Sequence, residues 1–151
     1  MATYTERVSE VMYPLLTEYT DLFGSAITRS AWVSMENYHR GWLYLNVGSI
    51  GTDYTLDVYL QEALTVGGLG GKTILGKAIT QLTGADDDSL ICIELRTEEM
   101  DVSNSFDFVA VVMDIRFGAQ NGTGVYLAWS FFGVEPRQAP VPTTNWTEIV
   151  G

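Results

Sequence analysis

From Trp32 onward, apolar and polar residues follow the period of a β-strand. The pattern is most regular over residues 54–61, where every second residue is apolar. A period of two places alternate side chains on opposite faces of a strand, so this segment predicts a strand with one buried face. The same alternation predicts strands over residues 90–96 and 125–132, and residues 106–117, which are almost wholly apolar, predict a further strand. Residues 72–82 fit either a strand or a short helix, and we favour the strand.

Residues 41–47 differ because both faces of the predicted strand are apolar. Trp42 and Tyr44 lie on one face, and Leu43, Leu45 and Val47 lie on the other. Strands that are covered on each side by another layer have this composition, so we expect a strand between two layers. The sequence Gly-Ser-Ile-Gly-Thr that follows predicts a turn into the next strand.

Some six strands separated by short turns predict a mainly β fold, an antiparallel β-sandwich or barrel that is jelly-roll-like. This body covers residues 31–134. The loop over residues 118–124 contains the pair Asn121-Gly122. Because this pair suits the positive backbone angles of a hairpin turn, we expect the two flanking strands to form a hairpin.

Residues 1–30 follow a different period. Apolar residues recur at helical spacing, at Val8, Val11, Met12, Leu15, Leu16, Tyr19, Leu22 and Phe23. This spacing predicts an N-terminal arm that is partly helical. Pro14 would break or kink a continuous helix, so a short helix from about Pro14 to Gly24 is the alternative. The apolar face packs either on the domain's own core or on a partner, and removal of residues 1–23 is expected to leave a folded domain.

Residues 135–151 contain three of the four prolines of the chain, Pro136, Pro140 and Pro142. Prolines at this density predict an extended C-terminal arm that does not pair centrally in a sheet. Trp146 and Ile149 near its end predict that the arm docks on a surface of the same subunit or of a neighbour. The chain is thus expected to form one globular domain with a segment at each end.

Length and composition exclude several classes of protein. A chain of 151 residues with 46% hydrophobic content can bury a core as one domain without disulfides or a structural metal. The single Cys92 stands in an apolar run and is expected to be a small buried hydrophobic residue. Because we find no run long enough to span a membrane and no signal peptide, we expect a soluble protein made in the cytosol.

The formal net charge of -11 opposes binding to nucleic acid, which requires clustered Lys and Arg. The acidic residues are dispersed, apart from the run Asp86-Asp87-Asp88. We expect this charge to keep the protein soluble and to discourage non-specific association.

Three features resemble motifs for chemistry, but none has the full pattern. Residues 66–73 end in Gly-Lys-Thr, yet Val66 stands where a phosphate-binding loop requires its first glycine. His39 is the only histidine, and no spacing links it to Cys92 or to a serine. The acidic stretches 86–88 and 98–101 lack the spaced ligands of a calcium loop. We therefore predict no catalytic, cofactor-binding or metal-binding residues, and a hydrolase with two carboxylates is the enzyme class left open.

Four segments resemble a family of small head proteins of tailed bacteriophages, which are commonly encoded beside the major capsid protein. In chain order they are residues 32–38, residues 55–63 with 68–72, residues 99–107, and residues 126–127 with 136–140. The order of the segments carries the resemblance, since no single one is specific. It covers most of the chain from Trp32, whereas the first thirty residues and the C-terminus depart from the family's pattern.

The resemblance implies a non-enzymatic structural protein of the virion, a capsid decoration or cement protein on the capsid exterior. Its partner would be the major capsid protein, and it would form a homotrimer at junctions between capsomers, where the symmetry is threefold or quasi-threefold. Neither nucleic acid nor a membrane would be a partner. The candidate contacts with the capsid or another subunit are Val8, Val11, Met12, Leu15, Leu16, Trp146 and Ile149.

Two other functions agree with the same sequence. A carbohydrate-binding β-sandwich module would use exposed aromatic residues, with Trp42, Tyr44, Tyr59 and Trp129 as candidates. A component of the neck or tail of the virion would form a ring of another symmetry instead of a trimer.

Overall fold

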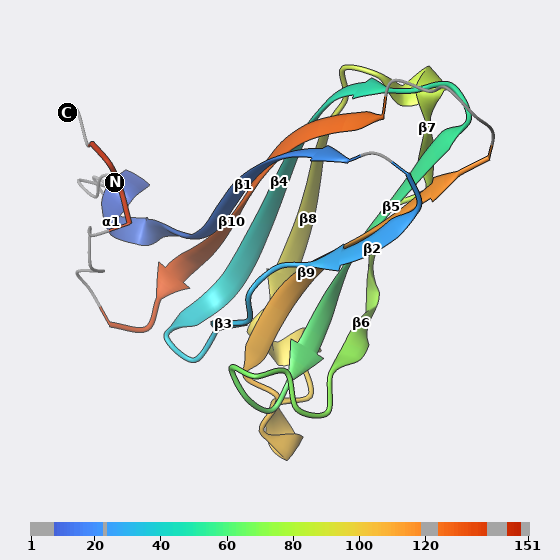
Figure 1. The fold of residues 1–151 in the computed structure, drawn as a ribbon. Helices are drawn as coiled ribbons and strands as arrows, with labels where there is room; N and C mark the ends of the chain where they lie inside the picture. Colours follow the sequence, from blue (N-terminus) through green and yellow to red (C-terminus); the bar gives the residue numbers. More distant parts are fainter. Residues whose placement is uncertain (1–7, 23, 119–123, 139–144, 149–151) are drawn as a thin grey trace.

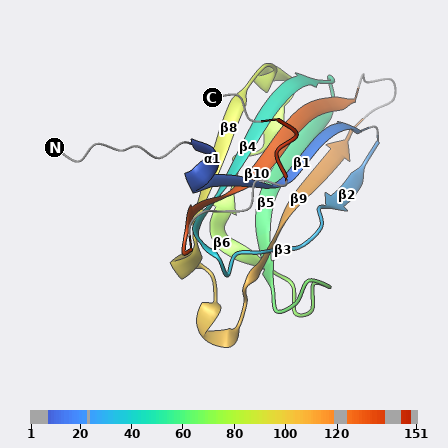
Figure 2. The same cartoon turned by 90° about the vertical axis from the view of Figure 1, so that its left-hand side faces the viewer.

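Two antiparallel sheets face each other and enclose the core (Figures 1 and 2). The computed structural model describes residues 8–22, 24–118, 124–138 and 145–148. Sheet A contains, in order across the sheet, β1 (Met12–Leu22), β10 (Val125–Pro136), β4 (Tyr38–Ile50) and β8 (Leu90–Arg96). Sheet B contains β2 (Ala26–Arg29), β9 (Phe108–Phe117), β5 (Tyr54–Ala63) and β6 (Lys72–Ala78), with β3 (Val33–Ser34) also on β9 and β7 (Leu82–Thr83) also on β5. The predicted mainly β sandwich is confirmed.

The helical elements of the described residues are short and lie in connections. They are α1 (Val8–Val11), η1 (Gly84–Asp86), η2 (Thr97–Glu99) and η3 (Val102–Asn104). The turn η1 lies between β7 and β8, whereas η2 and η3 together form most of the connection from β8 to β9.

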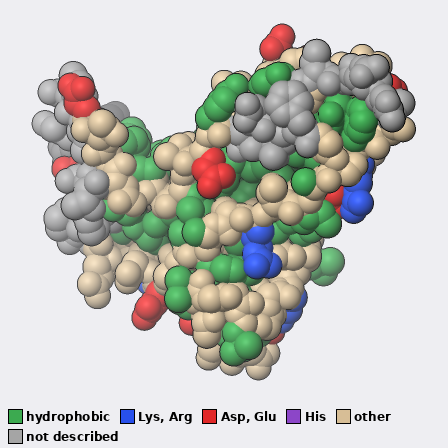
Figure 3. Space-filling model, in the orientation of Figure 1, with side chains coloured by type: hydrophobic (Ala, Val, Ile, Leu, Met, Phe, Trp, Pro, Cys, Tyr) green, Lys and Arg blue, Asp and Glu red, His purple; other side chains and the backbone are tan. Residues whose placement is uncertain are grey.

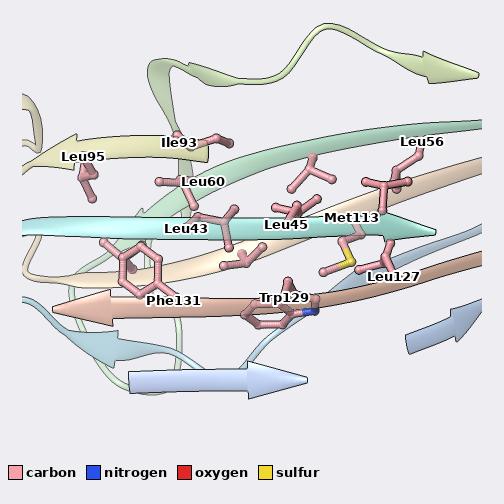
Figure 4. Packing of buried hydrophobic residues seen from close by; sticks show 14 of the residues in the cluster. Leu43, Leu45, Leu56, Leu60, Ile93, Leu95, Met113, Leu127, Trp129 and Phe131 are labelled. Atoms are coloured by element: carbon pink, nitrogen blue, oxygen red, sulfur yellow. The ribbon is translucent and has the colours of Figure 1, made fainter. Parts of the chain in front are cut away.

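The core uses one face of each long strand. Figure 4 shows Leu43, Leu45, Leu127, Trp129 and Phe131 from sheet A close to Leu56, Leu60 and Met113 from sheet B. Each of these side chains is at most 4% exposed. Burial of one such side chain stabilises a fold by about 1.5–3 kcal/mol, so this interlayer contact is the main source of stability.

The segments with a period of two form the predicted strands. Residues 54–61 lie in β5, which buries alternate residues. Residues 72–82 form β6 and β7, so the preference for a strand over a helix is confirmed. Strand β9 has five consecutive buried residues, from Val109 to Met113, because it is central in sheet B and pairs with β5 on one side and with β2 and β3 on the other.

The predicted hairpin around Asn121-Gly122 is wrong. Strand β9 before this loop belongs to sheet B and β10 after it belongs to sheet A, so the loop crosses between sheets. The turn predicted after β4 likewise joins β4 of sheet A to β5 of sheet B. A turn sequence indicates that the chain changes direction, but not which sheet the next strand joins. The Asn-Gly pair itself lies outside the described residues.

The helix predicted in the N-terminal arm is wrong beyond its first turn. Among the described residues of this arm, Val8–Val11 alone is helical, and the next eleven residues form β1, which pairs with β10. A β-bulge between Pro14 and Leu16 shifts the register of this pair. Because a bulge sets two residues against one, it breaks the period of two, and Leu15 and Leu16 both pack against the core. Consecutive apolar residues of this kind resemble a helical spacing.

Strand β1 is therefore part of the sandwich, which changes the expected effect of removing residues 1–23. The deletion would remove β1 from beside β10. It would expose part of the Phe131 and Trp129 side chains, which are 0% and 3% exposed in the intact protein. We expect that deletion to destabilise the domain instead of leaving it folded.

Lys77 links the two sheets along one side of the sandwich. Lys77 of β6 donates from Nζ to the carbonyl oxygen of Glu94 in β8 at 2.9 Å and forms an ion pair with Glu99 Oε2 at 2.6 Å. The same Glu99 oxygen accepts a hydrogen bond from the backbone N–H of Arg96 at 2.8 Å. These contacts link the β6 edge of sheet B to the β8 edge of sheet A.

The beginning of β4 depends on glycines that allow two aromatic rings to approach the backbone. A Cβ on Gly133 would lie 2.6 Å from the ring of Tyr38, and a Cβ on Gly41 would lie 2.5 Å from Phe131. The Tyr38 ring stacks on Tyr13 of β1 at a centroid distance of 6.5 Å. These glycines let rings from β4 and β10 fill the end of the core.

Gly133→Ala is expected to destabilise the protein by about 1–3 kcal/mol, because a well-packed ring cannot yield to an added methyl group without strain. Urea unfolding followed by tryptophan fluorescence measures this change. Gly67→Ala is the matched control, since a Cβ there meets nothing closer than 3.7 Å. Equal stability of the two variants would contradict the packing argument.

Candidate interaction surface

The outer faces of the two sheets differ in chemistry. On sheet B, the register places Asp57 beside Asp114, and Asp114 pairs with Arg116 at 2.7 Å. On sheet A, the corresponding outward positions carry Trp42, Tyr44 and Phe132. Polar side chains are usual for a sheet face in water, so the aromatic residues of sheet A need another explanation.

Three rows of outward residues cross sheet A, from β1 through β10 and β4 to β8. They are Tyr19–Ala128–Asn46–Leu90, Thr17–Ser130–Tyr44–Cys92 and Pro14–Phe132–Trp42–Glu94. We call these twelve residues the aromatic face. The aromatic face explains why both faces of residues 41–47 are apolar: Leu43, Leu45 and Val47 face the core, and Trp42 and Tyr44 belong to the aromatic face. The expectation of a strand between two layers is wrong, because no third layer of described residues covers Trp42 and Tyr44, which are half-buried.

A groove with a volume of about 470 Å³ runs over the aromatic face. The small residues Ala128 and Ser130 of β10 line it between Tyr19 of β1 and Tyr44 of β4. Tyr19 and Leu90 at its two sides are 71% and 70% exposed. Apolar groups gathered in one contiguous patch with the aromatic residues between them often mark a surface that another molecule covers.

Aromatic pairs build one end of the groove. The rings of Trp42 and Tyr44 meet edge to face with centroids 5.3 Å apart. Phe132 lies 6.2 Å from Trp146, which belongs to the C-terminal residues 145–148. Asn145 donates from Nδ2 to the carbonyl oxygen of Pro14 at 2.9 Å. The C-terminal segment therefore docks on its own subunit at this point.

The structure distributes the predicted contact residues between surface and core. Val8 of α1 is 67% exposed, Val11 is half-buried, and Met12 lines the groove. Leu15 and Leu16 pack against the core instead, and Trp146 lies on Phe132. Ile149 lies outside the described residues. Sequence reasoning missed Leu90 and Phe132 as surface groups, and it named Tyr44 for sugar binding but not as a contact with another protein.

The other end of the molecule collects the segments that carry the family resemblance. Lys72 of β6 bonds to Asp101 Oδ2 at 2.6 Å and lies 3.6 Å from Glu62 Oε1, and its ammonium is 3.9 Å from the centre of the Phe106 ring. Glu62 is only 4% exposed and accepts the backbone N–H of Asp101 at 2.8 Å. A buried carboxylate needs such partners, so this cluster fixes the loop after β8 against β5 and β6.

The glycine-rich loop over residues 64–71 belongs to the same end. A Cβ on Gly68, which has a φ of +82°, would lie 2.3 Å from the indole nitrogen of Trp32. Backbone hydrogen bonds join Leu64 to Leu69 and Gly71 to Gly68. The glycines thus form a hydrogen-bonded turn packed on Trp32, whereas a phosphate-binding loop would open into a helix.

A cavity of about 570 Å³ lies beside this cluster. It is lined by residues that include Met35, His39, Met100, Asp107 and Arg137. Arg137 donates from Nη2 to Thr97 Oγ1 at 3.2 Å, and its backbone N–H bonds to the carbonyl oxygen of Asn37. Residues 136–138 of the fourth family-like segment therefore reach this end as well, whereas residues 126–127 lie at the other end of β10.

The residues considered for chemistry are not brought together. His39 of β4 lies five residues along the strand from Tyr44, which pairs with Cys92, a separation of about 16 Å at the usual rise of a strand. Cys92 is exposed on the aromatic face, so its predicted burial is wrong. Partial loss of hydration, together with neighbouring Glu94, raises the pKa of this thiol. A raised pKa makes the thiolate scarcer and the residue less reactive.

The acidic run 86–88 has structural roles. Asp86 Oδ2 accepts the backbone N–H of Thr83 at 2.8 Å, and Asp87 Oδ1 accepts that of Ile50 at 2.6 Å. Within the described ranges, no group of three or more His, Cys, Asp or Glu side chains is arranged to hold a metal ion.

The aromatic residues proposed for sugar binding are also separated. Trp42 and Tyr44 lie on the aromatic face, but Trp129 is 3% exposed in the core. Tyr59 faces outward from sheet B, on the other side of the molecule. The four residues cannot form one platform for a saccharide.

No family model matches this sequence, and no curated protein matches it. Among solved structures, a chain of Desmodium yellow mottle tymovirus is similar over 83% of this chain and 87% of its own, with 13% identity and a TM-score of 0.43. A chain from the empty head of turnip yellow mosaic virus is similar over 83% and 80%, with 11% identity and a TM-score of 0.43. A chain of infectious bursal disease virus, strain Gx, matches 81% of this chain but 25% of its own, with 14% identity and a TM-score of 0.31. At these TM-scores the likeness carries no argument about function.

None of the helices in the described part of the chain has the length and apolar character needed to cross a membrane.

Low pH is expected to lower the stability of the fold through the carboxylates that pair with Lys72 and Lys77. The hydrogen bond from Lys72, and then that from Asn104, holds the pKa of Asp101 below its ordinary value, and Lys77 does the same for Glu99. A lowered carboxyl pKa stabilises the fold above the ordinary value near 4, and this stability is lost as the pH falls through the lowered pKa. The melting temperature should fall when thermal unfolding is followed from about pH 6 down to about pH 3.

Asp101→Asn should flatten this pH dependence, because the variant has no charge for Lys72 to stabilise. Glu36→Gln is the control, since Glu36 is exposed and its side chain has no hydrogen-bond or ion-pair partner within the described residues. If both variants kept the full pH dependence, the Lys72 cluster would not be its source.

Proposed function

We propose that this protein is a capsid decoration or cement protein of a tailed bacteriophage, which binds the outer surface of the shell built by the major capsid protein. The aromatic face is the observation that carries the proposal. It presents Trp, Tyr and Phe side chains with Met12 and Arg40 beside them, which is the composition of the centre of protein–protein interfaces. The resemblance of four segments to the phage head family supports the same function.

The rest of the molecule suits a protein that acts by binding. A two-layer body with a closed core keeps the aromatic face in one shape, so little conformational entropy is lost on binding. Repeated over a closed lattice, many modest contacts would oppose local opening of the shell by avidity. The net charge of -11 suits the capsid exterior, away from the packaged genome.

The predicted contacts divide into two groups under this proposal. Val8 and Met12 beside the groove remain candidates for direct contact with the shell, together with Trp146. Leu15 and Leu16 act through the core instead, by holding β1 in place. A homotrimer at threefold or quasi-threefold junctions remains part of the proposal, because such a site offers three equivalent contacts.

Purified protein is expected to co-sediment saturably with undecorated shells of the major capsid protein from the same genome. The number of bound copies per capsid subunit should approach a simple ratio set by the lattice. Failure to bind both immature and expanded shells would overturn the proposal and favour a neck or tail component.

Substitutions on the aromatic face should weaken loading without unfolding the protein. Tyr44→Ala and Leu90→Glu are each expected to reduce the affinity for shells about tenfold or more, as for residues at the centre of an interface. Ile27→Glu is the matched control, because Ile27 is 61% exposed on β2 of the other sheet. Equal loading of all three variants would show that another surface makes the contact.

A further inference from the structure

Each sheet has two edge strands, and an edge strand can accept a further strand through its free backbone groups. Sheet A ends in β1 and β8, and sheet B ends in β2 and β6. Figure 2 shows β8, β4, β10 and β1 side by side, so the two edges of sheet A lie on opposite sides of the molecule. The four edges differ in how many of their backbone N–H and C=O groups are free to bond to an added strand.

Three of the edges are short, irregular or partly occupied. On β8, the carbonyl of Glu94 accepts Lys77, and the N–H of Arg96 donates to Glu99. Strand β6 contains Gly76 at a φ of +75° and pairs with β5 in an irregular register. Strand β2 has only four residues. Such features are the usual protection of an edge against added strands.

The first half of β1 is protected in the same way. Pro14 has no N–H, and its carbonyl accepts the hydrogen bond of 2.9 Å from Asn145. The bulge between Pro14 and Leu16 follows directly. A proline, a bulge and a docked C-terminal segment together prevent pairing at this end of the strand.

The second half of β1 is regular and has no such protection. Pro14 opposite Phe132 cannot be a hydrogen-bonded pair, because Pro14 lacks the donor and its carbonyl points to Asn145. Along an antiparallel ladder, hydrogen-bonded and non-hydrogen-bonded pairs alternate. Ser130, Ala128 and Tyr126 follow Phe132 at intervals of two on β10, so their pairs with β1 are also non-hydrogen-bonded. Their partners on β1 therefore direct their backbone N–H and C=O groups away from β10. These partners are Thr17, Tyr19 and Asp21. No backbone hydrogen bond from another described residue reaches them on that side.

We propose that residues 17–22, which we call the open edge, accept an extended segment of the partner protein as a fifth strand of sheet A. The inference rests on the proposed function, in which the partner is the major capsid protein, and it specifies how part of the contact is made. Strand addition uses backbone hydrogen bonds for affinity and side-chain contacts for specificity. Tyr19 belongs to both the open edge and the aromatic face, so an added strand would extend the same surface.

The charge of the open edge defines the chemistry of its occupant. Its sequence, Thr-Glu-Tyr-Thr-Asp-Leu, contains two acidic residues and no basic one, and Glu18 is exposed. Pairing with the open edge of a second copy would bring like charges together across the ladder, which is unfavourable. A partner segment with Lys or Arg among apolar residues is favoured instead. Figure 3 shows hydrophobic side chains at the surface on this side of the molecule, with acidic groups among them.

Hydrogen exchange of the wild-type protein, alone and saturated on shells, tests the inference directly. In the free protein, the amides of Thr17, Tyr19 and Asp21 should exchange rapidly, whereas on shells a peptide that covers residues 17–22 should become protected. A peptide that covers β2 is the internal control and should not change. Unchanged exchange of residues 17–22 on loaded shells would overturn strand addition while leaving the decoration function intact.

Proline substitutions give an independent test. Thr17→Pro and Asp21→Pro each remove an N–H that points away from β10, so both should preserve the β1–β10 ladder. Each proline variant is expected to load about tenfold or more weakly than its alanine match, Thr17→Ala or Asp21→Ala, which retains the N–H. Equal loading of the proline and alanine variants, with unchanged melting temperatures, would contradict the proposal. If a proline variant unfolds, hydrogen exchange of the wild type decides.

Two further outcomes are distinguishable. The free protein could sediment as an oligomer. If Thr17→Pro converted that oligomer to monomers and Thr17→Ala did not, the occupant of the open edge would be a second copy, and the assignment to the partner would be overturned. Absence of any binding of the wild-type protein to shells would refute the proposed function, and with it the inference that rests on it.

Discussion

The interlock between the two sheets is the constraint on which the rest of the structure depends. Leu43, Leu45 and Phe131 of sheet A must face Leu56 and Leu60 of sheet B, and this requirement fixes the direction of every second side chain. All other positions on the same strands then point outward and are free of the demands of the core. An outward aromatic residue consequently reports on what the surface does, and sheet A has several where sheet B has charges.

The sequence is a good guide to the strands, because period-two alternation follows directly from the geometry of a half-buried strand. It is a poor guide where a local signal has two causes. Apolar residues on both faces of residues 41–47 indicate either a covered strand or an exposed binding face. Leu15 and Leu16 look helical because a bulge places consecutive residues against the core. The loop around Asn121 changes the direction of the chain but cannot show that β9 and β10 belong to different sheets.

The candidate surface could be predicted only in part for the same reason. Met12 and Trp146 do lie at the groove or beside it, but the groove is completed by Tyr44 and Phe132 from strands distant in sequence. Only the register between β10 and β4 brings those residues into adjacent rows. The family-like segments illustrate the converse, since parts of all four lie around Lys72 and Arg137 at one end, where they maintain the fold of the loops. Similarity of sequence can therefore mark a structural anchor as readily as a contact surface.

The tie between Lys77, Glu94 and Glu99 has a consequence for the way copies of this protein could associate. A sheet that is open at both edges can add strands in both directions, and identical molecules then form fibres without limit. Because the side chains of Lys77 and Glu99 already occupy backbone groups of Glu94 and Arg96 on the β8 edge, the proposed strand addition extends sheet A at β1. Under the proposal, the molecule can end a row of strands that begins in another protein, and it offers no second regular edge of sheet A to which a further copy could add.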